Sequence, residues 1–376
     1  MKNRFFTILV TFALLMGLTV TPVSAARNAT YTIIDLGTLG GDIVDITTVN
    51  DLNNHGQVVG TSTTASGERH AFLWQDGTMI DLGTLADGQY SLATAINDRG
   101  QVIGNSCPNE TCYGFFWEDG VMTDLGTLGS TDPDDSTEPS AINSHGQVVG
   151  YSYTASGARH GFLWEDGVMT DLGNFGAVDI NDRGQVVGTS TNASGEGHAF
   201  LWDDGVMTDL GTLGGSYSRA FFINNRGQVV GTSTTASEEL HAFLWEDGTM
   251  IDLALDGFRT SYPTALNDRG QVVGYSYNPT GETHAFLWDD GVTIDLGSLF
   301  GSSTIATDIN NRGQVVGVSW TADNTPHAFL WEDGVMIDLG TLGGDSSAAT
   351  DINDHGLIAG TSTTASGERH AVLWEK

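Results

Sequence analysis

Residues 180–215 read INDRGQVVGTSTNASGEGHAFLWDDGVMTDLGTLGG, and variants of this string recur eight times along the 376-residue chain. The tryptophan that ends each HAFLW-like segment marks the repeat, and successive tryptophans are 38 to 47 residues apart. They are Trp74, Trp117, Trp164, Trp202, Trp245, Trp288, Trp331 and Trp374. A period of about 40–45 residues is that of one four-stranded blade of a β-propeller. A helical repeat would need apolar residues every three to four positions, and glycine interrupts this unit throughout.

Each unit contains four short β-prone segments separated by turn residues. In the second unit we expect strands at residues 93–97, 101–106, 113–118 and 121–125. The first two are joined by Asn97-Asp98-Arg99-Gly100, a turn with glycine in the left-handed position. The last two are joined by Glu118-Asp119-Gly120, a tight Asp-Gly reversal. The pattern therefore predicts an antiparallel meander in every unit.

Both faces of a unit are expected to be buried. The third strand places His70, Phe72 and Trp74 on one face and Ala71 and Leu73 on the other, because side chains alternate along a strand. Both sets are largely apolar. This is typical of a blade packed between two neighbouring blades rather than a sheet with one solvated side.

The two ends of the repeat region are complementary. Residues 31–37 read YTIIDLG, a fourth strand without a third before it, and the last unit stops at residues 370–374, HAVLW, a third strand without a fourth. We expect the N-terminal strand to complete the last blade, which removes two open sheet edges and closes the ring. The sequence thus predicts an all-β, eight-bladed propeller of four-stranded antiparallel blades, one domain over residues 26–376. An open β-solenoid is the alternative, although it would need polar caps at its ends.

The first 25 residues have the features of a secretory signal peptide. Lys2 and Arg4 form a basic start, residues 5–20 are apolar, and Val23-Ser24-Ala25 suits cleavage. A transmembrane anchor is the alternative for this apolar run. No second apolar run of about 18 residues follows. We therefore expect a secreted protein, extracellular or periplasmic, with no membrane insertion once the signal is cleaved.

The charge balance excludes two classes of partner. The chain has 47 Asp and Glu residues against 14 Lys and Arg, a formal net charge of −33. Nucleic acid and anionic membranes both require clustered basic residues, so we expect neither as a partner. A large net charge keeps a protein soluble, and we expect a monomer.

Two strings in the repeat resemble a known family. HAFLW-x-DG-x-M-x-DLGTLGG and IN-x-x-GQVVG are similar to the repeats of the HAF-repeat proteins, a family of extracellular repeat proteins. The resemblance covers essentially the whole chain after the signal segment. It implies secretion, and it implies no particular activity or ligand.

Irregularities gather on one expected face of the ring. The links between second and third strands, and between one unit and the next, carry every insertion and deletion. Loops on a rigid scaffold commonly bind ligands, so we place a site for protein or glycan on this variable face or at the channel mouth. Non-repeated aromatic residues end second strands toward it: Tyr151, Tyr153, Tyr275, Tyr277 and Trp320. The last three lie on adjacent blades and could form an aromatic platform. The ordinary β-propensity of Tyr and Trp is the alternative.

Seven histidines begin the third strands, and Tyr113 replaces the eighth. They are His70, His160, His198, His241, His284, His327 and His370. Radial copies are too far apart to share one metal ion. We expect each histidine to hydrogen-bond a neighbouring turn or hydroxyl group. We expect each repeat tryptophan to pack in the core and the repeated aspartates to stabilise turns.

Two single-copy features lie on the variable face. The insert at residues 131–138 contains four carboxylates, Asp132, Asp134, Asp135 and Glu138. Ca²⁺ favours such oxygen clusters, but the spacing differs from an EF-hand loop, and a solvated acidic loop is the alternative. We expect no other cofactor. Cys107 and Cys112 are expected to form a disulfide that clips a hairpin loop.

Common catalytic motifs are missing from the sequence. It contains no nucleophile elbow, no H-E-x-x-H pair and no Walker loop. A carboxylate pair for glycoside hydrolysis has no sequence signature, because distance defines it. The sequence therefore favours a secreted, non-catalytic propeller that binds protein or glycan. The alternative is an extracellular hydrolase or lyase that acts on polysaccharide through carboxylates at the channel mouth. Non-repeated polar residues clustered at the pore would favour the enzyme.

Overall fold

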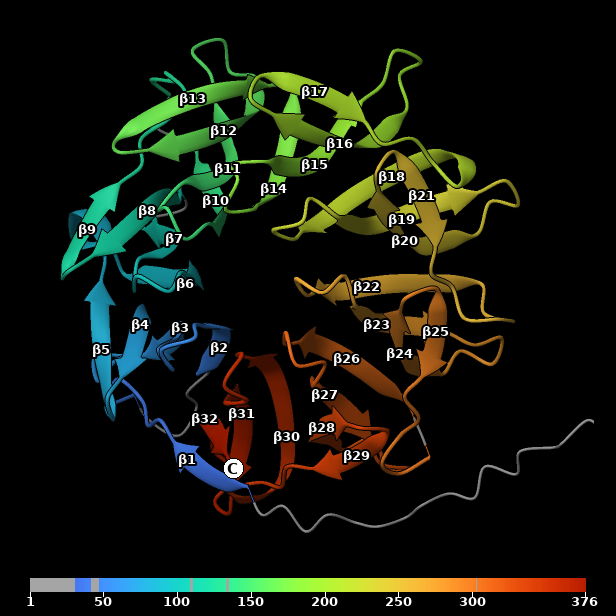
Figure 1. Ribbon diagram of the computed structural model, residues 1–376. Helices are drawn as coiled ribbons and strands as arrows, with labels where there is room; N and C mark the ends of the chain where they lie inside the picture. The colour runs from blue at the N-terminus through green and yellow to red at the C-terminus, as the bar shows by residue number, and fades with distance from the viewer. Residues whose placement is uncertain (1–30, 42–46, 109–110, 133–134, 302) are drawn as a thin grey trace, which may run out of the picture.

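Four-stranded antiparallel meanders account for nearly all of the computed structural model, which describes residues 31–41, 47–108, 111–132, 135–301 and 303–376 (Figure 1). Each repeat folds into one meander, which we call a unit. In two places a single parallel bridge joins neighbouring units into an eight-stranded sheet, Arg69 with Tyr90 and Leu240 with Thr260. The expected all-β organisation in four-stranded antiparallel sheets is confirmed.

The first strand of every unit lies innermost, around a central axis (Figure 1). Unit 1 consists of β2 (Thr48–Leu52), β3 (Val58–Thr63), β4 (Arg69–Gln75) and β5 (Thr78–Gly83). A short 3₁₀ turn, η1 (Leu85–Asp87), leads to unit 2, with β6 (Tyr90–Ile96), β7 (Val102–Cys107), β8 (Tyr113–Glu118) and β9 (Val121–Asp124). Unit 3 has β10 (Thr137–Ile142), β11 (Val148–Tyr153), β12 (Arg159–Glu165) and β13 (Val168–Gly173). Unit 4 has β14 (Phe175–Ile180), β15 (Val186–Thr191), β16 (Gly197–Asp203) and β17 (Val206–Asp209).

The second half of the chain repeats the same order. Unit 5 has β18 (Gly214–Ile223), β19 (Val229–Thr235), β20 (Leu240–Glu246) and β21 (Thr249–Asp252). Unit 6 has β22 (Thr260–Leu266), β23 (Val272–Tyr277), β24 (Thr283–Asp289) and β25 (Val292–Asp295). Unit 7 has β26 (Thr304–Ile309), β27 (Val315–Trp320), β28 (Pro326–Glu332) and β29 (Val335–Asp338). Unit 8 has β30 (Gly343–Ile352), β31 (Ile358–Thr364) and β32 (Arg369–Glu375).

The outer hairpin turns follow directly from the Asp-Gly pairs. Asp119 has φ 50° and Gly120 has φ 84°, so both lie in the left-handed region. A two-residue turn of type I′ requires this pair of conformations, and Asp-Gly is a favoured sequence for it. The first turn ends at Gly100, with φ 76°. Both turns were predicted from the sequence, and both are confirmed.

The core lies between units rather than within any one of them. Val58 and Phe72 of unit 1 pack against Leu373 of unit 8. On the other side of the same sheet, Val59 and Leu73 pack against Phe115 of unit 2. All eight repeat tryptophans belong to such clusters or pack against them. Each sheet is therefore apolar on both faces because both faces are covered by neighbours.

An N-terminal strand, β1 (Thr32–Asp35), pairs with β32. The pairing is antiparallel and places Ile34 opposite Leu373. Leu36, which follows the strand, is only 5% exposed and joins the cluster between units 8 and 1. His370 Nδ1 lies 2.8 Å from Asp35 Oδ2, so a side-chain contact accompanies the backbone ladder.

A buried asparagine after each first strand binds the next unit. Asn53 Nδ2 donates to the carbonyl oxygen of Asn97 at 3.0 Å, and Asn353 Nδ2 donates to the carbonyl oxygen of Asn53 at 3.1 Å. The same contact links every consecutive pair of units through Asn53, Asn97, Asn143, Asn181, Asn224, Asn267, Asn310 and Asn353. The IN-x-x-G string therefore encodes an inter-unit hydrogen bond as well as a turn.

Replacing one of these asparagines should cost considerable stability. The Asn224 side chain donates to Gln228 and to the Asn267 carbonyl, and accepts the N–H groups of Arg226 and Gln228. Asn224→Ala leaves these buried partners unsatisfied, and we expect it to lower the free energy of unfolding by about 3 kcal/mol. Asn225→Ala, one residue further and half-buried, should cost less than about 1 kcal/mol. Urea denaturation of both variants checks this, and equal losses would contradict it.

The N-terminal segment and the question of membrane-spanning helices remain. The expected signal peptide, residues 1–25, lies outside the described residues. Within the described part of the chain, no helix is long and apolar enough to cross a membrane.

Candidate active site at the central channel

Every unit contributes to a cavity of about 370 Å³ at the end of the channel formed by the first turns. Three consecutive residues of each unit line it: an aliphatic residue, the buried asparagine and a polar turn residue. In unit 2 these are Ile96, Asn97 and Asp98. The polar turn residues around the mouth are Asn54, Asp98, Ser144, Asp182, Asn225, Asp268, Asn311 and Asp354. Four carboxylates therefore lie at the mouth, and all four are aspartates of the first turns.

Contacts between units hold the mouth carboxylates in place. Asp98 accepts the Asn54 backbone N–H at 2.8 Å and its side-chain amide at 3.1 Å. Asn311 donates to Asp354 in the same way, at 2.8 and 2.9 Å. Because amide and carboxylate residues alternate over much of the rim, most carboxylates there have a donor from a neighbouring unit. These groups form a fixed polar rim.

A second set of aspartates lies one residue before the aliphatic ring. Only four units have one, and the equivalent residues of the others are Ala95, Ala141, Phe222 and Ala265. The four are Asp51, Asp179, Asp308 and Asp351, all half-buried. Each accepts a backbone N–H from the next unit, at 2.7, 2.8, 3.0 and 2.8 Å respectively. They are therefore polar groups on the first strands that the repeat does not place in every unit.

Three of these aspartates meet because units 7, 8 and 1 are consecutive in space. The Leu52 N–H lies 2.9 Å from Asp51 Oδ1 and 2.8 Å from Asp351 Oδ2, so two carboxyl groups share one donor. The Asp351 side chain also hydrogen-bonds those of Asp308 and Asp51. We call Asp51, Asp308 and Asp351 the channel carboxyl cluster.

Burial raises the pKa values of two members of this cluster, Asp351 and Asp51. The pKa of Asp351 is well above its usual range, first because the group is buried and then because Asp308 and Asp51 are negatively charged neighbours. Burial also raises the pKa of Asp51, although hydrogen bonds from Asp351 and from two backbone N–H groups oppose the shift. Adjacent carboxyl groups cannot all ionise cheaply, so the titrations of Asp351 and Asp51 depend on each other. The raised pKa of Asp351 favours its protonated form.

Asp179 provides an internal comparison. It makes the same inter-unit contact, with the Ile223 N–H at 2.8 Å, and burial raises its pKa to about 7. The groups that shift its pKa are backbone donors, with no second carboxyl among them. Asp179 therefore serves as a clamp between units 4 and 5 without being part of a carboxyl cluster.

Sequence reasoning missed the channel carboxyl cluster. The signal was present as Asp before Ile-Asn or Leu-Asn in four of the eight units. Its meaning depends on the adjacency of units 8 and 1, because Asp51 and Asp351 are 300 residues apart in sequence. An aspartate that recurs in only some units is easily taken for a turn residue, because the sequence does not show which side chains surround it in space.

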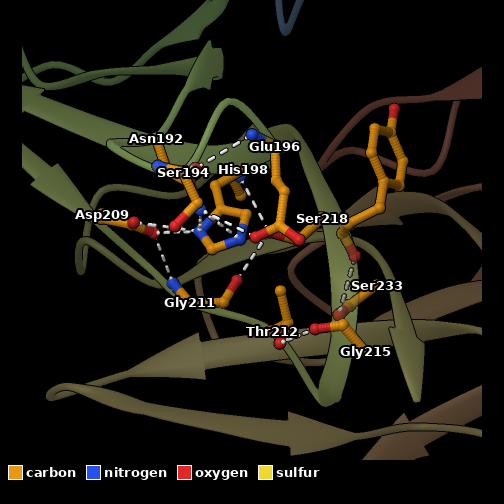
Figure 2. Close-up of polar contacts among 12 residues, drawn as sticks. Asn192, Ser194, Glu196, His198, Asp209, Gly211, Thr212, Gly215, Ser218 and Ser233 are labelled. Atoms are coloured by element: carbon orange, nitrogen blue, oxygen red, sulfur yellow. Dashed lines mark hydrogen bonds and ion pairs between the residues drawn. The ribbon is translucent and has the colours of Figure 1, made fainter. Parts of the chain in front are cut away.

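Each of the seven repeat histidines contacts an aspartate, a partner that the sequence did not predict, and His198 and His284 also contact an asparagine at a neighbouring turn. His198 Nδ1 lies 2.9 Å from Asp209 Oδ1, and the same oxygen accepts the Gly211 N–H at 2.8 Å (Figure 2). His241 and Asp252 form the same pair, where the Asp252 hydrogen bond raises the histidine pKa and burial opposes it. The aspartate lies on the adjacent fourth strand, so it is close to the histidine only in the paired sheet. These pairs join third and fourth strands.

The candidate aromatic residues are only partly together. Tyr275 and Tyr277 have ring centroids 5.7 Å apart, and Tyr262 stacks on Tyr275 at 5.4 Å. Tyr262 was missed because it lies on the first strand, opposite Tyr275 in the register. Among the described residues, no ring contact joins Trp320 to these tyrosines. Tyr277 is 40% exposed.

The remaining aromatic candidates lie in unit 3. The Arg159 guanidinium lies 3.2 Å from the centre of the Tyr151 ring. Tyr153 is half-buried and pairs with Arg159 in the strand register. Tyr151 lines a separate pocket between units 3 and 5.

The two single-copy features have different outcomes. The disulfide between Cys107 and Cys112 is present, as predicted. In the acidic insert, Asp134 lies outside the described residues, and Asp135 accepts a hydrogen bond from Ser130. Glu138 lies opposite Tyr151 in β10. Among the described residues, no group of three or more His, Cys, Asp or Glu side chains is arranged to hold a metal ion.

Comparisons with known proteins relate this fold to propellers. No family model matches the sequence, and no curated protein matches it. A puromycin-hydrolyzing peptidase from Mycobacterium tuberculosis is similar in structure, with a TM-score of 0.53 and 11% identity over 89% of this chain and 61% of that one. The β-propeller domain of the Trilobed protease from Pyrococcus furiosus has a TM-score of 0.50 and 12% identity over 78% and 98%. The acylaminoacyl peptidase from Pyrococcus horikoshii has a TM-score of 0.50 and 13% identity over 87% and 59%. The fold is a β-propeller.

These neighbours contradict the main functional expectation from the sequence. A non-catalytic module that binds protein or glycan was favoured, whereas the solved chains cited above come from peptidases and a protease. The alternative, a hydrolase with carboxylates at the channel mouth, agrees with them better. The sequence contains no contiguous catalytic motif, and a binding module was favoured over an enzyme for that reason.

Proposed function

We propose that this protein is an extracellular hydrolase whose acid and base groups are the channel carboxyl cluster. The observation that carries the proposal is that Asp51 and Asp351 accept the same Leu52 N–H, with Asp308 beside Asp351. Raised carboxyl pKa values in a cleft are typical of catalytic acids. The cluster also consists of polar residues that half of the units lack, and such irregular polar residues favour an enzyme over a repeated scaffold.

In the proposed reaction the protonated carboxyl group is the general acid and the ionised one is the general base. Asp351, whose raised pKa favours the protonated form, acts as the general acid and protonates the atom that leaves. Asp51, as the neighbouring carboxylate, takes a proton from water, and the resulting hydroxide attacks the bond to be cleaved. One product thus gains the proton from Asp351 and the other gains the hydroxide from water. The proton taken by Asp51 then passes to Asp351, which returns both groups to their starting forms. The Leu52 N–H orients both groups, since it contacts an oxygen of each.

A matched pair of variants tests this proposal. We expect Asp351→Asn to lower hydrolysis by a factor of about 10² to 10⁴, the usual contribution of a general acid or base. Asp179→Asn, which alters the same kind of inter-unit contact without touching the cluster, should retain activity. Reducing-end release from polysaccharides and cleavage of unfolded peptide are the two assays. Equal losses in both variants, or no turnover of either substrate class by the wild-type protein, would contradict the proposal.

We also propose that the eight units form a closed ring in which β1 completes the last blade. Three kinds of contact between units 8 and 1 support it: the β1–β32 pairing, the Asn353–Asn53 hydrogen bond, and the shared apolar cluster. Closure brings Asp351 next to Asp51, so the proposed active site depends on it. An open solenoid would keep units 1 and 8 apart and could not form these contacts.

The compartment and family are proposals of the same kind. We propose that the protein is a secreted monomer of the HAF-repeat type, on the strength of its repeated strings and its N-terminal segment. The Cys107–Cys112 disulfide supports an oxidising compartment.

A further inference from the structure

A second cavity, of about 570 Å³, opens on the variable face between units 3 and 5. It is lined by the ends of second strands and the starts of first and third strands, including Tyr151, Arg159, Tyr217 and Arg219. This is the opposite end of the strands from the first turns and the channel carboxyl cluster. An inference about this pocket is therefore independent of the hydrolase proposal.

The pocket exists because unit 4 is short on this face. Only Asn174 separates β13 from β14. Gly176 then occupies the position held by Glu138 in unit 3 and Arg219 in unit 5, as the strand registers show. A Cβ on Gly176 would meet no atom closer than 3.5 Å. The missing side chain leaves open space between two units that do have long side chains there.

The lining has an unusual charge for this chain. The protein has 47 acidic residues and 14 Lys and Arg, yet none of the residues that line this pocket is acidic and two are arginines. Arg159 stacks on Tyr151 and Arg219 on Phe221, at 3.2 and 5.2 Å from the ring centres. In the part of the chain that the structure describes, neither guanidinium forms an ion pair with a carboxylate. Both remain available to an external anion.

The geometry of the lining selects a carboxylate on a ring-shaped, hydroxylated ligand. A guanidinium stacked on an aromatic ring presents its N–H edge, which matches a carboxylate in a bidentate manner. Tyr217 is 38% exposed, and its ring lies against Gly197, where a Cβ would come within 3.1 Å of it. Its remaining surface offers an aromatic face, on which the apolar side of a sugar ring can pack. Ser140 and Asn174 add polar groups for hydroxyls.

We propose that this pocket binds acidic saccharides, with a uronate carboxylate held by Arg159 and Arg219 and the sugar ring packed on Tyr217. An acidic peptide would use the arginines but would leave the aromatic face unused. The volume is within the range of pockets that hold small ligands, about 300–1,000 Å³.

Titration calorimetry with tri-galacturonate tests the proposal on the full chain. We expect wild-type protein to bind it and to bind its methyl ester at least tenfold more weakly, because the ester lacks the charge. Arg159→Gln combined with Arg219→Gln should weaken tri-galacturonate binding at least tenfold. Arg259→Gln is the control, since Arg259 is 80% exposed, outside the pocket, and carries the same charge. Gly176→Leu should also abolish binding by filling the space, while preserving every charge.

Four results would overturn the proposal. They are the absence of tri-galacturonate binding at millimolar concentration, equal binding of the ester, unchanged binding by the double arginine variant, and binding of hexaglutamate as tight as that of tri-galacturonate. The last result would assign the pocket to acidic peptides. Equal unfolding midpoints for all variants would establish that any loss of binding is local.

Discussion

A variant that begins at Gly37 is expected to be about 5 kcal/mol less stable than one that begins at Tyr31. The variants differ by Tyr31, β1 and Leu36, and Leu36 is 5% exposed in the cluster shared by units 8 and 1. Ile33 and Ile34 of the strand are also partly buried against the last unit. Burying an aliphatic side chain contributes about 1.5–3 kcal/mol, so three such residues account for a loss of this size.

Loss of β1 should also change how the protein associates. Without it, β32 becomes an open sheet edge, with its backbone N–H and C=O groups unpaired. We expect the shortened variant to aggregate at concentrations where the longer one stays dispersed. Urea denaturation and light scattering measure the two effects. An unchanged unfolding midpoint would mean that the ring does not depend on its N-terminal strand.

One control separates the strand from its side-chain contact. Asp35→Ala removes the hydrogen bond to His370 and leaves the backbone ladder in place. This pair is partly exposed to solvent, with 19% of the His370 and 41% of the Asp35 side-chain surface accessible. We therefore expect a loss of less than about 1 kcal/mol. A loss as large as that of the shortened variant would locate the stabilisation in the side chains instead.

The second large effect is a fall in stability as pH rises from about 4 to about 7. Burial raises the pKa values of Asp51, Asp179 and Asp351 in the folded protein, that of Asp179 to about 7. The folded state therefore binds more protons than the unfolded chain across this range. Stability is fully present below the unfolded pKa near 4 and is lost as pH rises toward the folded pKa. Each group contributes up to about 1.4 kcal/mol per pH unit.

Asp179→Asn isolates one part of this dependence. Asparagine does not titrate, so the slope of unfolding free energy against pH between 4 and 7 should decrease by about the contribution of one group. The absolute stability of this variant is a separate matter, because the amide replaces one hydrogen-bond acceptor with a donor. Denaturation at half-unit pH steps gives the slope for both proteins. Identical slopes would mean that Asp179 ionises normally in the fold.

Elements encoded locally could be predicted from the sequence. The Asp119-Gly120 turn has the positive φ values that its sequence requires, and the strand at residues 113–118 has the predicted limits. The first strand of unit 2 begins three residues earlier than predicted, at Tyr90. The disulfide at Cys107 and Cys112 also follows from spacing alone, since its partners are close along the chain.

Contacts between distant residues were the ones that prediction missed. The histidine partner was sought in nearby turns and is an aspartate 11 residues away, brought close by strand pairing. Tyr262 joins Tyr275 for the same reason, whereas Trp320 has no ring contact with the tyrosines despite its adjacent unit. Sequence periodicity gives the face of a strand but not which rings touch.

The amino-acid sequence alone determined the unit of this protein: its period, its four strands, its turns and the double-sided apolar pattern, because each depends on residues within about 40 positions. Tertiary structure decided the two candidate sites. Asp51 and Asp351 meet only where the last unit adjoins the first, and Arg159 and Arg219 share a pocket only because unit 4 is short between them. The chemistry of both sites depends on distances across units, and those distances are set by packing.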